Sequence, residues 1–276
     1  MDIDAVAFDV NGTLVHIHTE DDMDAAFRAV GHLLTYQGID LRRHQVKDLY
    51  FQTLSAQKRD STETYPEFDA PGVWRTIIEA NATDFTHALP PEKLQQLPVL
   101  LAETYRGMTR RRLKLYPHVR AVLRSLHGRI PMAIVTDGQS TYARGELHKV
   151  DITDYFETVV VSGDHGYRKP DARLFQMAID VLGTAPEKTL YVGNDMYRDI
   201  FGAREVGMPT VMFDSDQGTK SYRDCVPDHT ITDHRQLLDI LGLTTPPDDA
   251  PTQDATPSEP APAPEPDCPV PSGPAD

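Results

Sequence analysis

The sequence is poor in cysteine, in long apolar runs and in positive charge. Its 276 residues include two cysteines, Cys225 and Cys268, so a disulfide framework is excluded and a thiolate metal site nearly so. No apolar run reaches the roughly 18–20 residues that a membrane-spanning helix needs. The first ten residues carry two early acids and no basic segment, which argues against a secretory signal. We therefore expect a soluble, cytoplasmic protein with no membrane partner.

Negative charge dominates the composition. Asp and Glu number 42 against 27 Lys and Arg, giving a formal net charge of −15, which argues against nucleic acid as the main partner. Residues 244–276 hold seven acids, no Lys, Arg or aromatic residue, and eleven of the 22 prolines. Such a segment buries too little apolar surface to offset the entropy of ordering it, so we expect a disordered tail. The alternative, a docking tail for a proline-binding module, lacks a basic-flanked PxxP motif.

Short apolar runs alternate with amphipathic stretches between Ile3 and about Asp233. The runs predicted as strands are IDAVAFDV, PMAIVTD, ETVVVSG, TLYVGND and PTVMFD. Their nearly continuous hydrophobicity is typical of strands covered on both faces, as in a parallel sheet. The amphipathic stretches predicted as helices include Val119–Leu126, Leu174–Leu182 and Ile200–Val206. Alternation of this kind predicts an α/β fold with a doubly wound parallel sheet.

A long helical stretch interrupts that alternation. From Val15 to Leu115 no strand is expected, whereas helical periodicity is good. The predicted helices are Met23–Tyr36, His44–Gln57, Val73–Ala80 and Glu92–Met108, and the predicted hinges are Leu14–Thr19 and Arg112–Tyr116. The expected domains are a core of residues 1–14 and 116–243, a helical insertion of residues 15–115, and the tail of residues 244–276. An insertion after the first strand overhangs the crevice where α/β sheets bind ligands.

Polar residues follow four of the predicted strands. The segments at the strand ends are Asp9-Val10-Asn11-Gly12-Thr13, Thr136-Asp137-Gly138, Arg168-Lys169-Pro170 and Gly193-Asn194-Asp195, with Asp199 four residues further on. Each alone has an ordinary structural explanation, since an acid at a strand end commonly caps the next helix. Four in succession favour a shared site at one edge of the sheet.

This set of side chains is suited to binding and attacking a phosphate. Asp9 and an acid near Asp195 would form an oxygen-rich site of the kind that Mg²⁺ prefers. Lys169 and backbone N–H groups near Asn11 and Asp137 would neutralise the phosphoryl group, so that an aspartate becomes a plausible nucleophile. The Thr136 hydroxyl would donate to a phosphate oxygen. Gly138 would let the backbone approach the phosphate closely.

The segments DVNGTL, TDG, RKP and GNDMYRD resemble motifs one to four of the haloacid dehalogenase superfamily, over Ile3 to Asp214. The resemblance implies a Rossmann-like core with a C1-type helical cap, an aspartate nucleophile and usually Mg²⁺. By position, it implies that Asp9 is the nucleophile and that Thr136 and Lys169 bind phosphate. The metal ligands would come from Asp9, Asn11, Asp195 and Asp199.

Two residues depart from the pattern of this superfamily. Asn11 stands where phosphatases generally carry a second aspartate that acts as general acid and base, and an amide cannot transfer a proton at neutral pH. Either the enzyme favours leaving groups that need no protonation, or a nearby residue substitutes. The candidates for a substitute are His16, His18 and Glu20. Asn194 also replaces the first Asp that many members have in motif four.

These observations predict a Mg²⁺-dependent phosphatase that acts on a small phosphorylated metabolite through an aspartyl-phosphate. The alternative is a metal-independent 2-haloacid dehalogenase, because the founding enzymes also lack the second aspartate; Arg28 and Arg42 are candidates for its substrate arginine. A third possibility is a non-catalytic binding protein. The segment Tyr65–Phe68 is predicted as a loop of the insertion that could touch the substrate.

Overall fold

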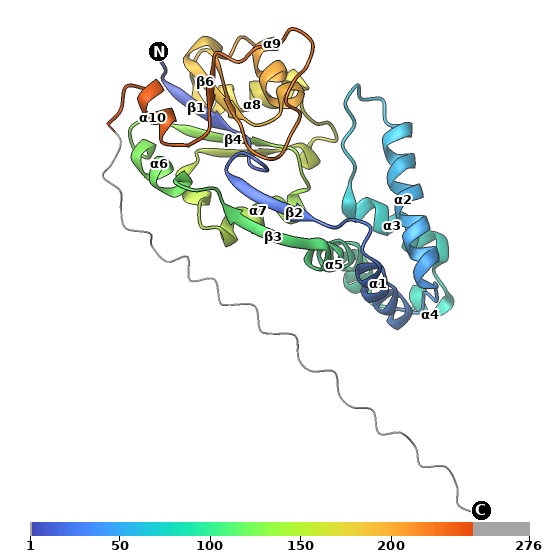
Figure 1. Cartoon of the computed structure of the whole chain (residues 1–276). Coiled ribbons are helices and arrows are strands. Elements are labelled where there is room, and N and C mark those ends of the chain that lie inside the picture. The colour runs from blue at the N-terminus through green and yellow to red at the C-terminus, as the bar shows by residue number, and fades with distance from the viewer. Residues whose placement is uncertain (1, 245–276) are drawn as a thin grey trace, which may run out of the picture. The chain divides into compact units, whose positions relative to one another are not determined.

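The computed structural model describes residues 2–244 and contains one six-stranded parallel sheet, in the order β5-β4-β1-β6-β7-β8 (Figure 1). The strands are β1 (Ala5–Phe8), β4 (Met132–Thr136), β5 (Thr158–Val161), β6 (Thr189–Gly193), β7 (Thr210–Phe213) and β8 (His229–Ile231). The first five lie within the apolar runs that predict them, so the predicted parallel sheet is confirmed. β8 is an edge strand of sequence HTI, too short and polar to be predicted.

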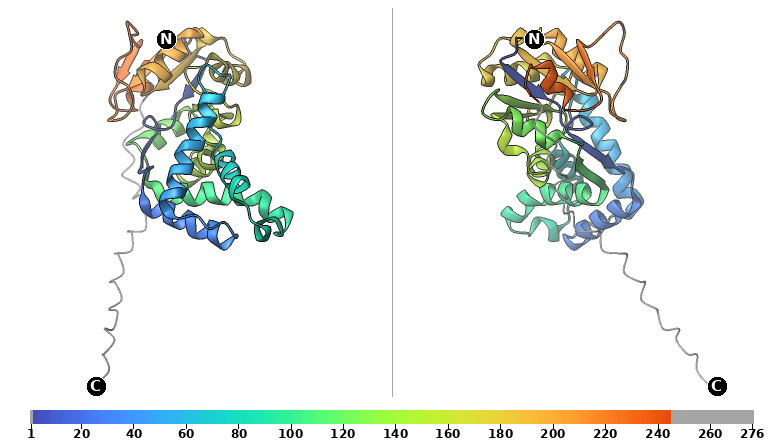
Figure 2. Two further views of the ribbon diagram at one scale, coloured as in Figure 1. Left: turned by 90° about the vertical axis from the view of Figure 1, so that its right-hand side faces the viewer. Right: turned by 60° about the vertical axis from the view of Figure 1, so that its left-hand side comes forward.

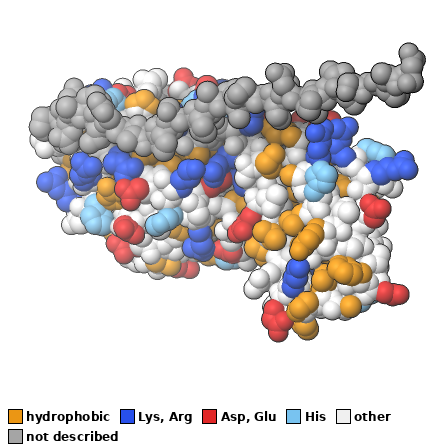
Figure 3. Space-filling view, turned by 90° about the horizontal axis from the view of Figure 1, so that it is seen from below, with side chains coloured by type: hydrophobic (Ala, Val, Ile, Leu, Met, Phe, Trp, Pro, Cys, Tyr) orange, Lys and Arg blue, Asp and Glu red, His pale blue; other side chains and the backbone are white. Residues whose placement is uncertain are grey.

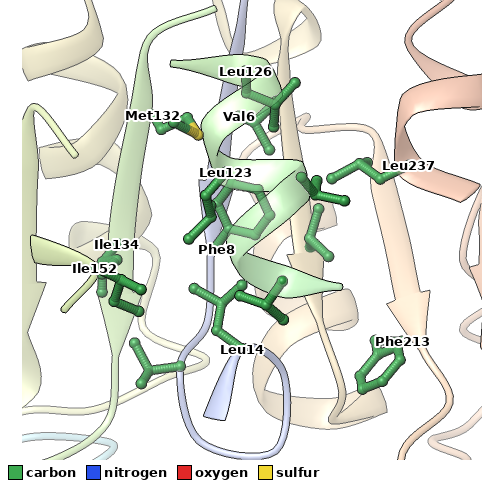
Figure 4. Close-up of a cluster of buried hydrophobic side chains, with 14 of the residues drawn as sticks. Val6, Phe8, Leu14, Leu123, Leu126, Met132, Ile134, Ile152, Phe213 and Leu237 are labelled. Atoms are coloured by element: carbon green, nitrogen blue, oxygen red, sulfur yellow. The ribbon is translucent and has the colours of Figure 1, made fainter. Parts of the chain in front are cut away.

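Helices cover both faces of this sheet (Figure 1). One face packs against α6 (Val119–Leu126), α7 (Ser140–Lys149) and α10 (Gln236–Ile240), and the other against α8 (Ala172–Leu182) and α9 (Gly202–Glu205), which follows the π-helix η4 (Met196–Phe201). Side chains of β1 alternate between the two faces, as in any strand. Phe8 packs with Leu123 of α6 on the first face (Figure 4), whereas Ala7 belongs to the cluster on the second.

Between β1 and β4 the chain forms a separate group of helices, which we call the insert (residues 15–115; Figure 2). Its helices are α1 (Asp24–Tyr36), α2 (Arg43–Asp60), α3 (Ala70–Asn81), α4 (Asp84–His87) and α5 (Pro91–Thr109). Four of them match the predicted helices, and α4 is an additional short one. The insert has a hydrophobic cluster of its own, in which Phe27, Tyr50, Trp74 and Tyr105 pack together.

The expectation that no strand lies between Val15 and Leu115 is wrong. β2 (Val15–Thr19) and β3 (Arg110–Leu115) pair in an antiparallel ribbon that connects the insert to the core. Their sequences, VHIHT and RRRLKL, are short and largely polar, so neither predicts a strand alone. Each strand is stabilised by a partner about one hundred residues away, and such pairing leaves no local signal.

The surface of the insert carries several large apolar side chains. Among the described residues, those that are exposed on its helices are Tyr36, Phe85, Val99, Leu100 and Met108. Figure 3 shows hydrophobic side chains reaching the surface on the underside of the molecule. No helix in residues 2–244 is long and apolar enough to cross a membrane. The predicted disordered tail, apart from Thr244, lies outside the described residues.

Candidate active site

Polar side chains gather where β4, β1 and β6, the central strands of the sheet, reach their carboxyl ends. A cavity of about 470 Å³ opens there between the core and the insert, a volume typical of small-molecule sites. We call its two sides the core wall and the insert wall. The core wall includes Asp9, Asn11, Thr136, Asp137, Gly138, Gln139, Arg168, Asn194 and Arg198. The insert wall includes Asp21, Tyr50, Phe51, Leu54, Lys58, Glu67, Phe68, Tyr105 and Arg106.

Lys169 connects two carboxylates beneath the core wall. Its Nζ donates to Asp9 Oδ1 at 2.7 Å and to Asp199 Oδ1 at 2.6 Å, and it lies 3.3 Å from the Tyr191 hydroxyl. All four side chains are buried. Burial alone would lower the pKa of Lys169, but the Asp199 and Asp9 carboxylates raise it well above its ordinary value. Lys169 therefore stays charged at neutral pH and compensates the negative charge of Asp9.

The other oxygen of Asp9 contacts Thr13, which also contacts Asn194. The Thr13 hydroxyl lies 2.9 Å from Asp9 Oδ2 and 3.1 Å from Asn194 Oδ1, which brings the ends of β1 and β6 together. Gly12 has φ +89°, and a Cβ there would come within 2.2 Å of the Asn194 amide nitrogen. Glycine is therefore required at position 12 both by the backbone conformation and by the close approach of Asn194.

The loop after β4 is held by side chains from the loop after β5. Asp137 accepts the Lys169 backbone N–H at 2.9 Å and pairs with Arg168 at 3.2 Å. The Gly138 N–H donates to Ser162 Oγ at 2.9 Å. Thr136 is 2% exposed and lines the cavity. Of the predicted phosphate-binding residues, Thr136, Asp137 and Gly138 thus lie on the core wall, whereas Lys169 lies behind Asp9.

Asp195 caps the helix that follows it. Its Oδ1 accepts the N–H groups of Tyr197 and Arg198, and its Oδ2 accepts the Thr219 N–H and the Arg198 guanidinium. Burial alone would raise the pKa of Asp195, but these donors lower it to about 2. Asp195 is therefore hydrogen-bonded as a helix N-cap, one of the two possibilities that the sequence leaves open.

Asp199 is equally engaged. Its Oδ2 accepts the backbone N–H groups of Asn194 and Asp195, both at 3.0 Å, while its Oδ1 accepts from Lys169. Burial raises the pKa of Asp199 to about 6, against the opposing effect of Lys169. Neither Asp195 nor Asp199 lines the cavity. Both carboxylates hold the core wall together rather than face the cavity.

A family model described as haloacid dehalogenase-like hydrolase matches residues 3–207. The chain belongs to this family. The hydrolase is 35% identical over 114 residues to a glyceraldehyde 3-phosphate phosphatase of Pyrococcus furiosus, covering 39% of this chain and 46% of that protein. It is 36% identical over 125 residues to a phosphoserine phosphatase of Thermus thermophilus, covering 45% and 48%. It thus spans about half the length of these curated relatives, or less.

The fold of this haloacid dehalogenase-like hydrolase is also found in solved structures. A 2-haloacid dehalogenase of Pseudomonas syringae superimposes with a TM-score of 0.63 at 20% identity, covering 87% of this chain and 98% of that one. The family predicted from the four motifs is therefore confirmed, together with its α/β core.

The acids near Asp9 do not form a ready metal site in the described part of the hydrolase. Within residues 2–244 no group of three or more His, Cys, Asp or Glu side chains is arranged to hold a metal ion. Asp9 Oδ2 and the Asn194 amide oxygen share one neighbour, the Thr13 hydroxyl. A carboxylate with a neighbouring amide oxygen fits Mg²⁺ that binds together with a phosphate, because this ion keeps several waters and uses one or two carboxylates plus substrate oxygens.

The proposed substitutes for a second aspartate do not reach the cavity. His16 stacks on Tyr116 and lies 3.1 Å from Arg112, and Glu20 pairs with Arg111; neither they nor His18 line the cavity. Arg28 and Arg42, the candidates for a dehalogenase arginine, do not line it either.

An acid that the motifs do not include lines the cavity instead. Glu67, from the predicted substrate-contacting loop, accepts the Ser162 hydroxyl at 2.9 Å, and burial raises its pKa. Ser162 also receives the Gly138 N–H, so its hydroxyl links the insert to the loop after β4. Gln139 accepts the Ala70 N–H at 2.8 Å and donates to the Phe68 carbonyl. These contacts were missed because nothing in the local sequence of Glu67, Gln139 or Ser162 indicates their pairing.

Proposed function

We propose that this hydrolase is a phosphatase that removes phosphate from a small phosphorylated metabolite through an aspartyl-phosphate on Asp9. The observation that carries the proposal is the position of Asp9: a buried carboxylate at the end of β1, bound to a charged lysine and opening into a cavity of metabolite size. The names of the curated relatives, both phosphatases, support it. The insert would act as a cap that excludes water from the cavity.

Each step follows from the residues of the core wall. An oxygen of Asp9 attacks phosphorus, and the bond from phosphorus to the leaving oxygen breaks as the leaving group takes the electron pair. Water then attacks the aspartyl-phosphate, releases inorganic phosphate and restores the carboxylate. Lys169 compensates the charge of Asp9, and the Thr136 hydroxyl and the nearby backbone N–H groups would bind phosphate oxygens. Asn11 would orient the leaving oxygen without protonating it, which favours aryl or acyl phosphates.

Mg²⁺ would be bound by Asp9 and Asn194 together with the substrate phosphate. The ion would supply positive charge beside the phosphoryl oxygens. Asn11 remains a predicted ligand. For Asp195 and Asp199, whose oxygens already accept hydrogen bonds from Arg198, Lys169 and backbone N–H groups, we propose a role in positioning the loop after β6.

The test is release of inorganic phosphate from p-nitrophenyl phosphate with Mg²⁺, measured for the wild type, Asp9→Asn and the exposed control Asp22→Asn. We expect Asp9→Asn to lose at least about 10³-fold in kcat, as nucleophile removal does in other covalent hydrolases, and the control to match the wild type. Activity of Asp9→Asn above a tenth of the wild type contradicts the proposal.

A metal-independent dehalogenase is the second candidate. It is favoured by the amides at positions 11 and 194 and by the engagement of Asp195 and Asp199 with protein donors. In that reaction Asp9 would displace halide from a 2-haloacid, and water would hydrolyse the resulting ester. Halide release from 2-chloropropionate in EDTA, without phosphatase activity, would establish this alternative. Absence of both activities would favour a binding protein.

A further inference from the structure

The cations that line the cavity are matched by carboxylates with one exception. Arg106 donates to Glu146 at 2.8 and 2.9 Å, Arg168 pairs with Asp137 at 3.2 Å, and Arg198 pairs with Asp195 at 3.0 Å. Within the described part of the chain, Lys58 is the one cavity-lining cation that has no carboxylate within 4 Å. A charge left unmatched in a partly buried cavity is available to a ligand.

Lys58 lies in an aromatic and apolar setting. It follows Tyr50 and Leu54 on α2 at intervals of four residues, so the three side chains share one face of the helix, and all of them line the cavity. The Lys58 Nζ lies 5.2 Å from the centre of the Phe68 ring. This cation–π contact stabilises the ammonium group without neutralising it. Apolar neighbours reduce the local dielectric constant, so an anion bound there would be attracted more strongly than in water.

The position of Lys58 relates it to the reacting end of the cavity. Phe68 is hydrogen-bonded through its carbonyl to Gln139, which directly follows the Thr136–Gly138 loop. Lys58 therefore lies on the insert wall near the proposed phosphate-binding loop. Asp21 lines the cavity beside Tyr105, whose ring packs on that of Tyr50. Tyr50 is eight residues from Lys58, or about 12 Å along the helix, so Asp21 and Lys58 line different parts of the cavity.

We propose that Lys58 binds a second anionic group of the substrate, on the part that departs from phosphorus, so that the preferred substrate is a phosphoester that also carries a carboxylate or another phosphate. This inference rests on the proposed phosphatase function. The cations of the core wall are already paired with carboxylates, whereas the Lys58 ammonium on the insert wall is available to bind the substrate. A neutral leaving group would leave the ammonium without a partner.

The test compares three small phosphoesters with the full-length protein and Mg²⁺: ethyl phosphate, phosphoglycolate and ethylene glycol bisphosphate. If Lys58 binds a second anion, the wild type should prefer phosphoglycolate and ethylene glycol bisphosphate to ethyl phosphate by roughly ten- to a hundredfold in kcat/KM. Lys58→Gln should lose that preference and keep its rate on ethyl phosphate within about twofold. Lys58→Arg should restore it in part. The matched control is Arg59→Gln, which removes an exposed cation that pairs with Asp60 on the same helix.

Comparable losses on all three esters in Lys58→Gln would overturn the inference, as would a wild type without preference. The ratio of the rates on phosphoglycolate and the bisphosphate distinguishes a carboxylate from a phosphate as the second anion. If none of these esters is hydrolysed and p-nitrophenyl phosphate is not hydrolysed either, the proposed function fails. Whether or not p-nitrophenyl phosphate is hydrolysed, binding to Asp9→Asn still tests Lys58 when the three esters are inert. By calorimetry, phosphoglycolate should then bind roughly tenfold more weakly to Asp9→Asn/Lys58→Gln than to Asp9→Asn, and equal affinities would refute the role of Lys58.

Discussion

The two walls of the cavity are built on different physical principles. On the core wall each charged group is matched: Asp9 and Asp199 by Lys169, Asp137 by Arg168, and Asp195 by Arg198. The insert wall combines aromatic rings with charged side chains and includes an ammonium group without a carboxylate partner, that of Lys58. A network of paired charges holds the reacting groups in place before the substrate binds. An unpaired charge is available to bind an anionic group of the substrate. The comparison suggests that the core wall performs the reaction and that the insert wall selects what is admitted.

The largest expected difference between the walls is in stability. Lys169→Met leaves Asp9 and Asp199 buried without a counter-charge, so the free energy of unfolding should fall by about 3–5 kcal/mol. Lys58→Met removes a partly buried cation without a carboxylate partner and should change the free energy of unfolding by less than about 0.5 kcal/mol. Urea unfolding at pH 7 measures both. Equal losses of unfolding free energy in the two variants would contradict the distinction between the paired Lys169 and the unpaired Lys58.

The next prediction concerns which wall supplies the proton to the leaving group. Asn11→Asp should raise kcat on ethyl phosphate by about 10²-fold, because it would supply a general acid that the amide cannot provide. The rate on p-nitrophenyl phosphate, whose leaving group needs no proton, should change by less than about threefold.

If Glu67 of the insert wall already donates the proton, the result will differ. Asn11→Asp will then give no gain on ethyl phosphate, and Glu67→Gln will abolish the basic limb of the pH profile of kcat. That outcome would mean that the insert wall also contributes a catalytic group, so that the two walls would not have separate roles.

A smaller effect is expected where the walls touch. Ser162→Ala removes the hydroxyl that accepts the Gly138 N–H and donates to Glu67, so the loop after β4 loses one of its links to the insert. We expect KM for p-nitrophenyl phosphate to rise roughly tenfold, the equivalent of one lost hydrogen bond between buried groups, with kcat within about threefold. The control Ser125→Ala removes a hydroxyl that bonds only within α6. A fall in kcat at constant KM would contradict this positioning role.

The smallest effect concerns acid stability of the core wall. Asp195 has a pKa of about 2 when folded against an ordinary value of 3.8, so between these values the unfolded chain binds a proton that the folded chain does not. Stability therefore rises with pH through this window, is fully present above 3.8 and is lost as the pH falls through about 2. Asp195→Asn should flatten this part of the profile and cost about 1 kcal/mol at pH 7 after allowance for solvent screening. Urea unfolding between pH 2.5 and 5 measures the slope, and an unchanged slope would contradict the assignment.

Much of this protein follows from local patterns. Continuous β-branched runs predict the central strands because a parallel sheet is buried on both faces. The order of Asp9, Thr136, Lys169 and Asp195 along the chain places them at strand ends, and parallel strands bring their carboxyl ends to one edge. The helices of the insert follow from their 3.6-residue periodicity. These inferences need only the residues within one element and the known geometry of that element.

Contacts between distant segments could not be predicted in this way. The β2–β3 ribbon, the contact of Thr13 with Asn194 and the contact of Glu67 with Ser162 join residues between 91 and 181 positions apart. Asp195 shows the same limit for a single side chain. Its sequence position suits a metal ligand or a helix cap equally, and only the folded chain shows that it accepts the N–H groups of Arg198 and Thr219.

Residue types and their spacing were enough to specify the elements, the sheet and the edge where the polar groups collect, since those depend on short-range periodicity and on the fixed direction of parallel strands. The partners of each charge emerged only in the folded chain, because hydrogen bonds and ion pairs depend on distances of a few ångströms that no spacing along the sequence encodes. The matched lysine beneath Asp9 and the unmatched lysine across the cavity have the same side chain, and their surroundings alone separate them.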